Sequence, residues 1–206
     1  MAGHDEDRDI NILTGSYENF IPESGYEKIE LDMGCGTGSF TAGLAERYPN
    51  RRVYGADVMI GRLRKVVKKI RQRKLTNMST LRVEARMLIG IMLPDRSIDR
   101  IHLLCPDPWP KGRHRDHRLL CCDFTTQLHR VLKDDGIFHF SSDDITYRNA
   151  VAEVIAQSGL FEIDPTGLED IKDIRSDFEN RWLEEGKTVL HTTWRKKPLP
   201  KVTIGH

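Results

Sequence analysis

Leu31-Asp-Met-Gly-Cys-Gly-Thr-Gly38 joins two differently patterned segments, and it decides the fold of this chain. Residues 26–33 have the pattern of a strand, whereas residues 39–48 repeat apolar side chains at helical spacing until Pro49. Glycines at alternate positions let the backbone turn from a strand into a helix and approach a ligand closely. The stretch therefore predicts the first strand and helix of a parallel sheet, with a binding site at the turn.

The same alternation of strand and helix patterns continues along the chain. Expected strands cover residues 26–33, 52–57, 79–84, 98–105, 137–142, 159–163 and 188–194, and expected helices cover residues 39–48, 62–77, 119–132 and 144–158. This order favours an α/β fold, a single doubly wound Rossmann-like domain at residues 26–206, with a mostly parallel seven-stranded sheet and an antiparallel edge strand. Residues 1–25 are charged and interrupted by glycine and proline, so we expect a loosely ordered tail.

Composition limits the class of protein. A length of 206 residues suits one domain, and no apolar run approaches the ~20 residues that span a bilayer, so no membrane partner is expected. The first eleven residues are acidic and do not resemble a secretory leader. The four cysteines lack zinc spacing, which favours reduced thiols, a cytoplasmic location and no metal. The sequence leaves a monomer or a homodimer open.

Positive charge is concentrated in three segments, although the net charge is only +1. Residues 62–74 hold eight Lys or Arg and no acid, and two further clusters lie at residues 111–118 and 195–197. A solvated face would explain any one of them. Phosphate backbones are also held by Lys and Arg, so the three clusters together favour a nucleic-acid partner.

Acidic residues at the ends of successive strands indicate which ligand the turn binds. Asp32 precedes the glycine turn, whose spacing differs from the dinucleotide fingerprint; an acid there suits a cationic ligand such as S-adenosylmethionine rather than a pyrophosphate. Asp57 ends the next expected strand and could accept from a ribose diol, or it could cap the following helix. Glu84 could accept from an adenine amino group, or it could be an ordinary exposed strand end.

Cys105-Pro-Asp-Pro-Trp-Pro-Lys111 follows the strand expected at residues 98–105. Prolines on both sides restrict the backbone, which holds Asp107 stiffly where ligands bind in open α/β sheets. Trp109 could stack on an unpaired base. Alternatively, the prolines only end the strand and the indole fills a gap in its own loop.

Together these motifs make the chain resemble the bacterial tRNA (guanine-N7-)-methyltransferase family, a branch of the class I S-adenosylmethionine-dependent methyltransferases. The resemblance rests on Pro-Asp-Pro-Trp-x-Lys at 106–111, the glycine turn at 32–38, and Gly-Ala-Asp at 55–57. It implies the class I fold, S-adenosylmethionine as cofactor and tRNA as partner. The cofactor contacts that it implies are Asp32, Gly34, Gly36, Gly38, Asp57, Glu84 and Asp107. The substrate contacts that it implies are Lys111, Asp143, Ser176, Asp177, Phe178 and Glu179.

Within this resemblance Asp107 is also the proposed catalytic residue. Guanine N7 carries a lone pair and no proton, so alignment matters more than a general base. A carboxylate that accepts from guanine N1–H or N2–H would stabilise the cation that develops on the purine. The family usually has Glu at position 32 and a basic residue at position 177. The acids at 116 and 177 therefore leave two alternatives: a class I methyltransferase for a small molecule or another RNA, and a cofactor-binding RNA-interaction protein without turnover.

Overall fold

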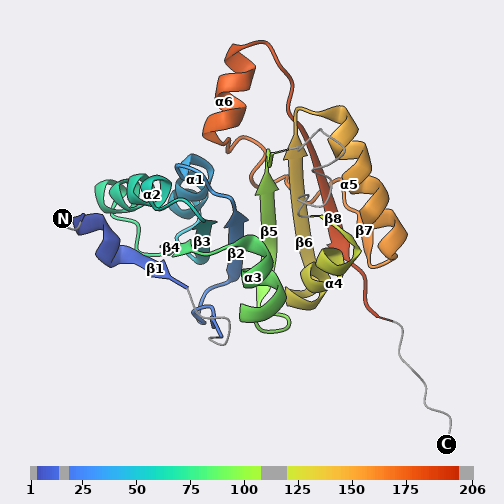
Figure 1. Cartoon of the computed structure of the whole chain (residues 1–206), viewed down its shortest axis with the longest axis horizontal. Helices are drawn as coiled ribbons and strands as arrows, with labels where there is room; N and C mark the ends of the chain where they lie inside the picture. The colour runs from blue at the N-terminus through green and yellow to red at the C-terminus, as the bar shows by residue number, and fades with distance from the viewer. Residues whose placement is uncertain (1–3, 14–18, 108–119, 200–206) are drawn as a thin grey trace, which may run out of the picture.

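The computed structural model describes residues 4–13, 19–107 and 120–199 (Figure 1). Its strands are β1 (Ile10–Ile12), β2 (Lys28–Met33), β3 (Arg51–Asp57), β4 (Met78–Arg82), β5 (Ile98–Leu104), β6 (Leu132–Ser142), β7 (Phe161–Ile163) and β8 (Leu190–Lys196). Its helices are η1 (Asp5–Asp9), α1 (Ser39–Arg47), α2 (Ile60–Arg73), α3 (Ala85–Met87), η2 (Leu88–Met92), α4 (Cys122–Val131), α5 (Ile145–Ser158) and α6 (Asp177–Glu184). The doubly wound α/β prediction is confirmed.

All of these strands belong to one sheet, in the order β1-β4-β3-β2-β5-β6-β8-β7. Five neighbouring pairs, from β1 to β6, are parallel, and β8 runs antiparallel to both β6 and β7. The sheet therefore has eight strands rather than the expected seven. Antiparallel pairing at this edge of the sheet was expected and is confirmed; β8 is inserted between β6 and β7, so that β7 is the outermost strand.

The additional strand comes from the segment that we expected to be a loosely ordered tail. In β1, Ile10 lies opposite Thr80 and Ile12 lies opposite Arg82, so this short strand covers the edge of β4. The acidic helix η1 just before it contacts α2: Arg64 donates to Asp7 at 2.7 and 2.9 Å, and Arg71 donates to Asp5 at 2.6 Å. For residues 5–12 the tail prediction was wrong, because edge hydrogen bonds and ion pairs compensate for a small apolar surface.

Two apolar layers cover the sheet, one on each face. Side chains of η2, α4 and α5 pack with Leu31 and Met33 of β2 in one core, and side chains of α1 and α2 form the core on the other face. Figure 1 shows α1 and α2 beside one half of the sheet and α4 and α5 beside the other. Because side chains alternate along a strand, Glu30 and Asp32 lie on the face opposite to Leu31. Buried polar residues are thus placed beneath α1.

Gly38 fixes the approach of α1 to α2. Its φ is +79°, and a Cβ added there would lie 2.8 Å from a Val66 methyl carbon. We expect Gly38→Ala to lower the free energy of unfolding by about 2–4 kcal/mol, from the left-handed backbone and the overlap together. Urea denaturation measures this change. Gly61→Ala in α2 is the matched control: a Cβ there meets nothing within 4 Å, so it should raise stability by about 1 kcal/mol, and equal losses in both variants would contradict the packing role of Gly38.

The other expected elements are present with shifted boundaries. The strand expected at residues 79–84 ends at Arg82, so Glu84 lies beyond it and precedes α3. The sheet strand β6 begins at Leu132, five residues before the expected position. All four cysteines lie in the described segments and are free thiols. Within the ranges that the structure describes, no helix has the length and apolar composition needed to cross a membrane.

Candidate functional site

A cavity of about 230 Å³ lies at the carboxyl edge of the sheet, by the ends of β2 and β5. From β2 the chain continues to β3 and β4 on one side of the sheet, and from β5 it continues to β6 on the other side. Open α/β sheets bind ligands where the strand order reverses in this way. Helix α6 lies beyond the arrowheads of β5 and β6 in Figure 1. The lining residues are Asp32, Gly34, Cys35, Gly36, Thr37, Ser39, Phe40, Arg62, Leu104, Ser176, Asp177, Phe178 and Arg181.

The glycine turn forms one wall of this cavity. Gly34 and Gly36 have φ values of +73° and +58°, which side chains disfavour, and both residues line the cavity. The N–H groups of Gly34 and Cys35 donate to the carbonyl of Ala56 at 2.8 and 3.0 Å, which ties the turn to the end of β3. Gly38 packs against α2 and is absent from the lining. Two of the three glycines therefore leave the backbone open to a ligand.

Asp32 supplies a buried carboxyl group at this wall. Its side chain accepts a hydrogen bond of 2.6 Å from the hydroxyl of Thr41, and the residue is 2% exposed. Burial raises the pKa of Asp32 to about 7, against the opposing effect of the Thr41 hydrogen bond, and the Asp57 charge raises it further. A buried acid without a cationic partner is destabilised in its charged form. A cationic ligand in the cavity would supply that partner.

Asp57 is bonded to the turn rather than exposed in the cavity. Its carboxylate accepts from the N–H of Gly36 at 3.2 Å and from the N–H of Met59 at 2.8 Å, and Arg62 lies 3.5 Å away. Met59 is the N-cap of α2, so the capping alternative does not describe Asp57. The cavity does not include Asp57. Asp57 therefore braces the turn through its hydrogen bond with Gly36, and Gly36 in turn lines the cavity.

The segment around α6 forms the opposite wall. Asp177 accepts hydrogen bonds from Thr37 and Ser39, the latter at 2.5 Å, and lies 3.8 Å from the ammonium of Lys69. These contacts attach α6 to the glycine turn across about 140 residues of chain. The nearest atom to a Cβ placed on Gly36 would be a Phe178 ring carbon, at 3.9 Å. The expected substrate residues of this segment thus lie against the expected cofactor turn.

Ser176 and Glu179 have different positions within this segment. Ser176 caps α6 by accepting from the N–H of Glu179 at 3.2 Å, and it lines the cavity. The Glu179 carboxylate is 3.3 Å from Nε2 of His191 and 3.7 Å from Nε of Arg175. Glu179 is 8% exposed and outside the lining. It therefore lies behind the wall to which Phe178 and Ser176 contribute.

The chain leaves β5 through a strained residue. Cys105 has φ +49°, an uncommon conformation for a residue with a side chain, and its N–H donates to Ser141 at 2.9 Å. Leu104 lines the cavity, and Asp107, three residues later, is exposed. Asp107 therefore follows shortly after a strand whose last residue lines the cavity. Lys111 and Trp109 lie outside the described residues.

Two further expected site residues are exposed and outside the cavity lining. Asp143 follows the end of β6. Glu84 accepts from the N–H of Met87 at 3.0 Å as the N-cap of α3. We expected Glu84 to end a strand, either as an acceptor for adenine or as an ordinary exposed residue. Its hydrogen bond as the cap of α3 was not expected. Contacts of these two residues with ligands stay predictions.

Sequence reasoning missed several residues of the site. Thr41 was assigned only to the helix at residues 39–48, but its hydroxyl donates to Asp32. A hydroxyl nine positions after Asp32 was the one sequence feature that pointed to this contact. Arg62 was counted only as part of a basic helix, yet it lines the cavity together with Arg181. Two guanidinium groups and a buried carboxyl thus surround the same space. The cavity can accept a ligand that carries both a cation and an anion.

A family model and curated proteins match most of the chain. The family model described as "Putative methyltransferase" matches residues 26–192. A tRNA (guanine-N(7)-)-methyltransferase of Thermotoga maritima is 32% identical over 169 residues, which are 82% of this chain and 54% of that protein. A protein of the same name from Syntrophotalea carbinolica is 32% identical over 82% of this chain and 74% of its own length. The chain thus spans about half of the first relative and three quarters of the second.

Solved structures share the fold at low identity. The crystal structure of the 16S rRNA methyltransferase KamB has a TM-score of 0.61 at 17% identity and covers 84% of this chain and 89% of its own. The [4+2]-cyclase SpnF has a TM-score of 0.57 at 16% identity, over 85% of this chain and 77% of its own. Proteins titled with different reactions therefore have this fold, and the fold alone does not identify the reaction.

Proposed function

This chain belongs to the tRNA (guanine-N(7)-)-methyltransferase family, and we propose on this premise that it transfers a methyl group from S-adenosylmethionine to N7 of a guanosine in the tRNA variable loop. The observation that best supports the cofactor is the buried Asp32 carboxyl, on the wall of a cavity beside a glycine turn. S-adenosylmethionine carries an ammonium and a carboxylate, and Asp32 and the two cavity arginines have the complementary charges.

In this proposal different residues of the cavity bind different groups of the cofactor. Asp32 would pair with the ammonium group, and Arg62 or Arg181 with the carboxylate. The exposed backbone at Gly34 and Gly36 would allow close approach, while Asp57, already braced by the Gly36 amide, would lie toward the ribose. When bound, the cofactor supplies an electrophilic methyl group on a sulfonium. These residues would hold the methionine part and the ribose of the cofactor, and a contact of Glu84 with adenine is not required for that.

The acceptor would approach from the side of Asp107 and α6. Asp107 is exposed beyond the strained end of β5, where its carboxylate can accept from guanine N1–H or N2–H as positive charge develops on the purine. Phe178 is 46% exposed and offers a ring beside the glycine turn, suited to contact with a base that has left its stack. Lys111 and Asp143 complete the proposed substrate contacts. Cytoplasmic location and a monomeric or homodimeric state remain predictions.

The proposal is tested by asking which nucleotide is labelled. Purified protein incubated with methyl-labelled S-adenosylmethionine and total tRNA is expected to label tRNA, and strand cleavage specific for 7-methylguanosine should locate the label in the variable loop. Label in another RNA would support the alternative acceptor. Cofactor binding by calorimetry with no transfer to any RNA would instead indicate a binding protein without turnover.

A further inference from the structure

A line of polar side chains crosses four adjacent strands, from the buried Glu30, His102 and His139 to the exposed His191, and ends beside the proposed site. Glu30 of β2 is 2.9 Å from Nε2 of His102 in β5, and the Nδ1 atoms of His102 and His139 are 2.9 Å apart. Nε2 of His139 is 2.9 Å from Nδ1 of His191 in β8, whose Nε2 is 3.3 Å from Glu179 in α6. All six ring nitrogens therefore have a partner within the line.

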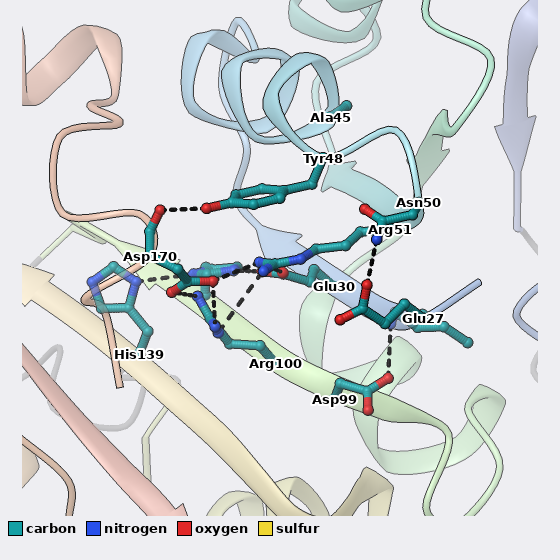
Figure 2. Close-up of polar contacts among 12 residues, drawn as sticks. Glu27, Glu30, Ala45, Tyr48, Asn50, Arg51, Asp99, Arg100, His139 and Asp170 are labelled. Atoms are coloured by element: carbon teal, nitrogen blue, oxygen red, sulfur yellow. Dashed lines mark hydrogen bonds and ion pairs between the residues drawn. The ribbon is translucent and has the colours of Figure 1, made fainter. Parts of the chain in front are cut away.

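The inner end of this line is anchored by fixed charges. Glu30 is fully buried and accepts from Arg51 at 2.8 Å; Arg51 and Arg100 in turn donate to Asp170 at 2.7 and 3.1 Å. Figure 2 shows the two guanidinium groups and the Asp170 carboxylate gathered around Glu30, with His139 beside them. Two cations adjacent to Glu30 favour its charged form.

Three neutral rings between two carboxylates provide one proton fewer than the four contacts of the line need. Each of the four contacts needs one proton between its two atoms, and a neutral imidazole carries one N–H. Three neutral rings between two carboxylates supply three protons for four contacts, so one contact would place two lone pairs against each other. Such a contact is costly where it is buried, as the Glu30–His102 and His102–His139 contacts are. A fourth proton, on a ring or on a carboxyl group, satisfies all four contacts.

The electrostatics place that proton at the outer end. Burial, followed by the neighbouring His102 and His191, holds the pKa of His139 well below its usual range, and burial lowers the pKa of His102 against the opposing effect of Glu30. Burial alone would raise the pKa of Glu30, but the His102 hydrogen bond and the arginine charges lower it overall. The inner members therefore disfavour the additional proton, which leaves His191 and Glu179.

We propose that His102, His139 and His191 are positioning residues that hold one proton for Glu179, and that this shared proton fixes the Glu179 carboxylate on His191 behind the substrate wall. The role of Glu179 as a substrate neighbour rests on the proposed function; the shared proton does not. Loss of that proton leaves one contact without a hydrogen, and Glu179 is then released from His191. Ser176 would transmit this change, because its hydroxyl accepts from the Glu179 backbone.

Other ionisable groups lie near the outer end of the line, around Glu179. Nε of Arg175, on the segment before α6, lies 3.7 Å from the Glu179 carboxylate. On the sheet side, Glu179 and Asp143 both raise the pKa of Cys105, after the larger effect of burial, so Cys105 stays a neutral thiol near Glu179. In this proposal the shared proton lies between His191 and Glu179.

The test uses the free protein with 15N-labelled histidine, followed by NMR from about pH 5 to about pH 8. In the wild-type protein we expect one ring to be doubly protonated at the acidic end, and the loss of one proton to shift the nitrogen resonances of all three rings together. Glu179→Gln supplies a permanent amide N–H to His191, so this titration should disappear. His139→Phe should uncouple His102 from His191.

Two controls keep the interpretation specific. His129→Phe removes another buried histidine, which bonds the Lys197 carbonyl at 2.8 Å outside the line, and it should leave the coupled titration unchanged. Three rings that titrate separately, or an unaltered curve in Glu179→Gln, would overturn the proposal. Because neither RNA nor cofactor is present, a coupled titration in a protein that labels no tRNA would reject the proposed function and keep the shared proton.

Discussion

Replacing Asp107 by asparagine is expected to lower kcat for methyl transfer by about 100- to 1,000-fold, while cofactor affinity changes by less than about threefold. The carboxylate is isosteric with the amide, so the backbone beyond Cys105 keeps its course. What is lost is the negative charge that faces the purine as it becomes cationic. Single-turnover rates and calorimetry with S-adenosylmethionine measure the two quantities separately.

Asp123→Asn is the control for this experiment, because Asp123 is also exposed and lies in the first turn of α4. It should leave both quantities unchanged. Equal losses of turnover and cofactor affinity in Asp107→Asn would mean that Asp107 only contacts the cofactor. The catalytic assignment would then have to be abandoned.

Asp32→Asn is expected to change stability and cofactor affinity in opposite directions. The folded-state pKa of Asp32, about 7, lies above its ordinary value of 3.8, so folding favours the protonated form. The stability contribution of this group is complete below about pH 4 and is lost as the pH rises through about 7. Asparagine avoids that loss. Above pH 7 the variant should therefore be more stable than the wild type in urea denaturation, by up to about 4 kcal/mol.

Cofactor binding by the same variant should weaken. An ammonium group binds the ionised Asp32, so wild-type affinity for S-adenosylmethionine should fall as the pH drops below about 7, because protons compete for the carboxylate. Asp32→Asn should bind about 30-fold more weakly at pH 8, a loss of about 2 kcal/mol, and lose that pH dependence. Calorimetry across pH measures both effects.

Thr41→Val tests the effect of the Thr41 hydrogen bond while it leaves the Asp32 carboxyl in place. Removing the hydroxyl that donates to Asp32 should move the midpoint of the binding curve to higher pH, since the Thr41 hydrogen bond lowers the pKa. A wild-type affinity that is constant across neutral pH would refute the pairing of Asp32 with a cation.

Local patterns were enough to predict the central sheet and one wall of the site. Strand patterns located β2, β3 and β5, and the acids and glycines at their ends were expected at one edge, since parallel strands end together. Asp32 and Gly34 accordingly line one cavity. These features depend on a few consecutive residues, which is why sequence reasoning reached them.

Long-range contacts were not accessible in the same way. The insertion of β8 between β6 and β7 depends on antiparallel pairing that no local pattern encodes. Asp177 looked like a departure from the family, yet it connects α6 to Thr37 and Ser39. The three histidines of the line from Glu30 to Glu179 were also missed. The available signal was a polar ring within apolar strands, as in Ile-Phe-His-Phe at 137–140.

The acidic helix η1 reduces the attraction of the basic helix α2 for a polyanion. Arg64, Lys68 and Arg71 are within 4 Å of acids of η1, and Arg73 pairs with Glu46. A polyanion that approaches α2 would meet cations that already have tethered counterions, at an effective concentration in the millimolar range. Binding there would release carboxylates of the chain itself rather than salt ions, so it would gain little of the counterion-release entropy that normally drives such binding. The eight positive charges of that segment therefore overstate its attraction for RNA.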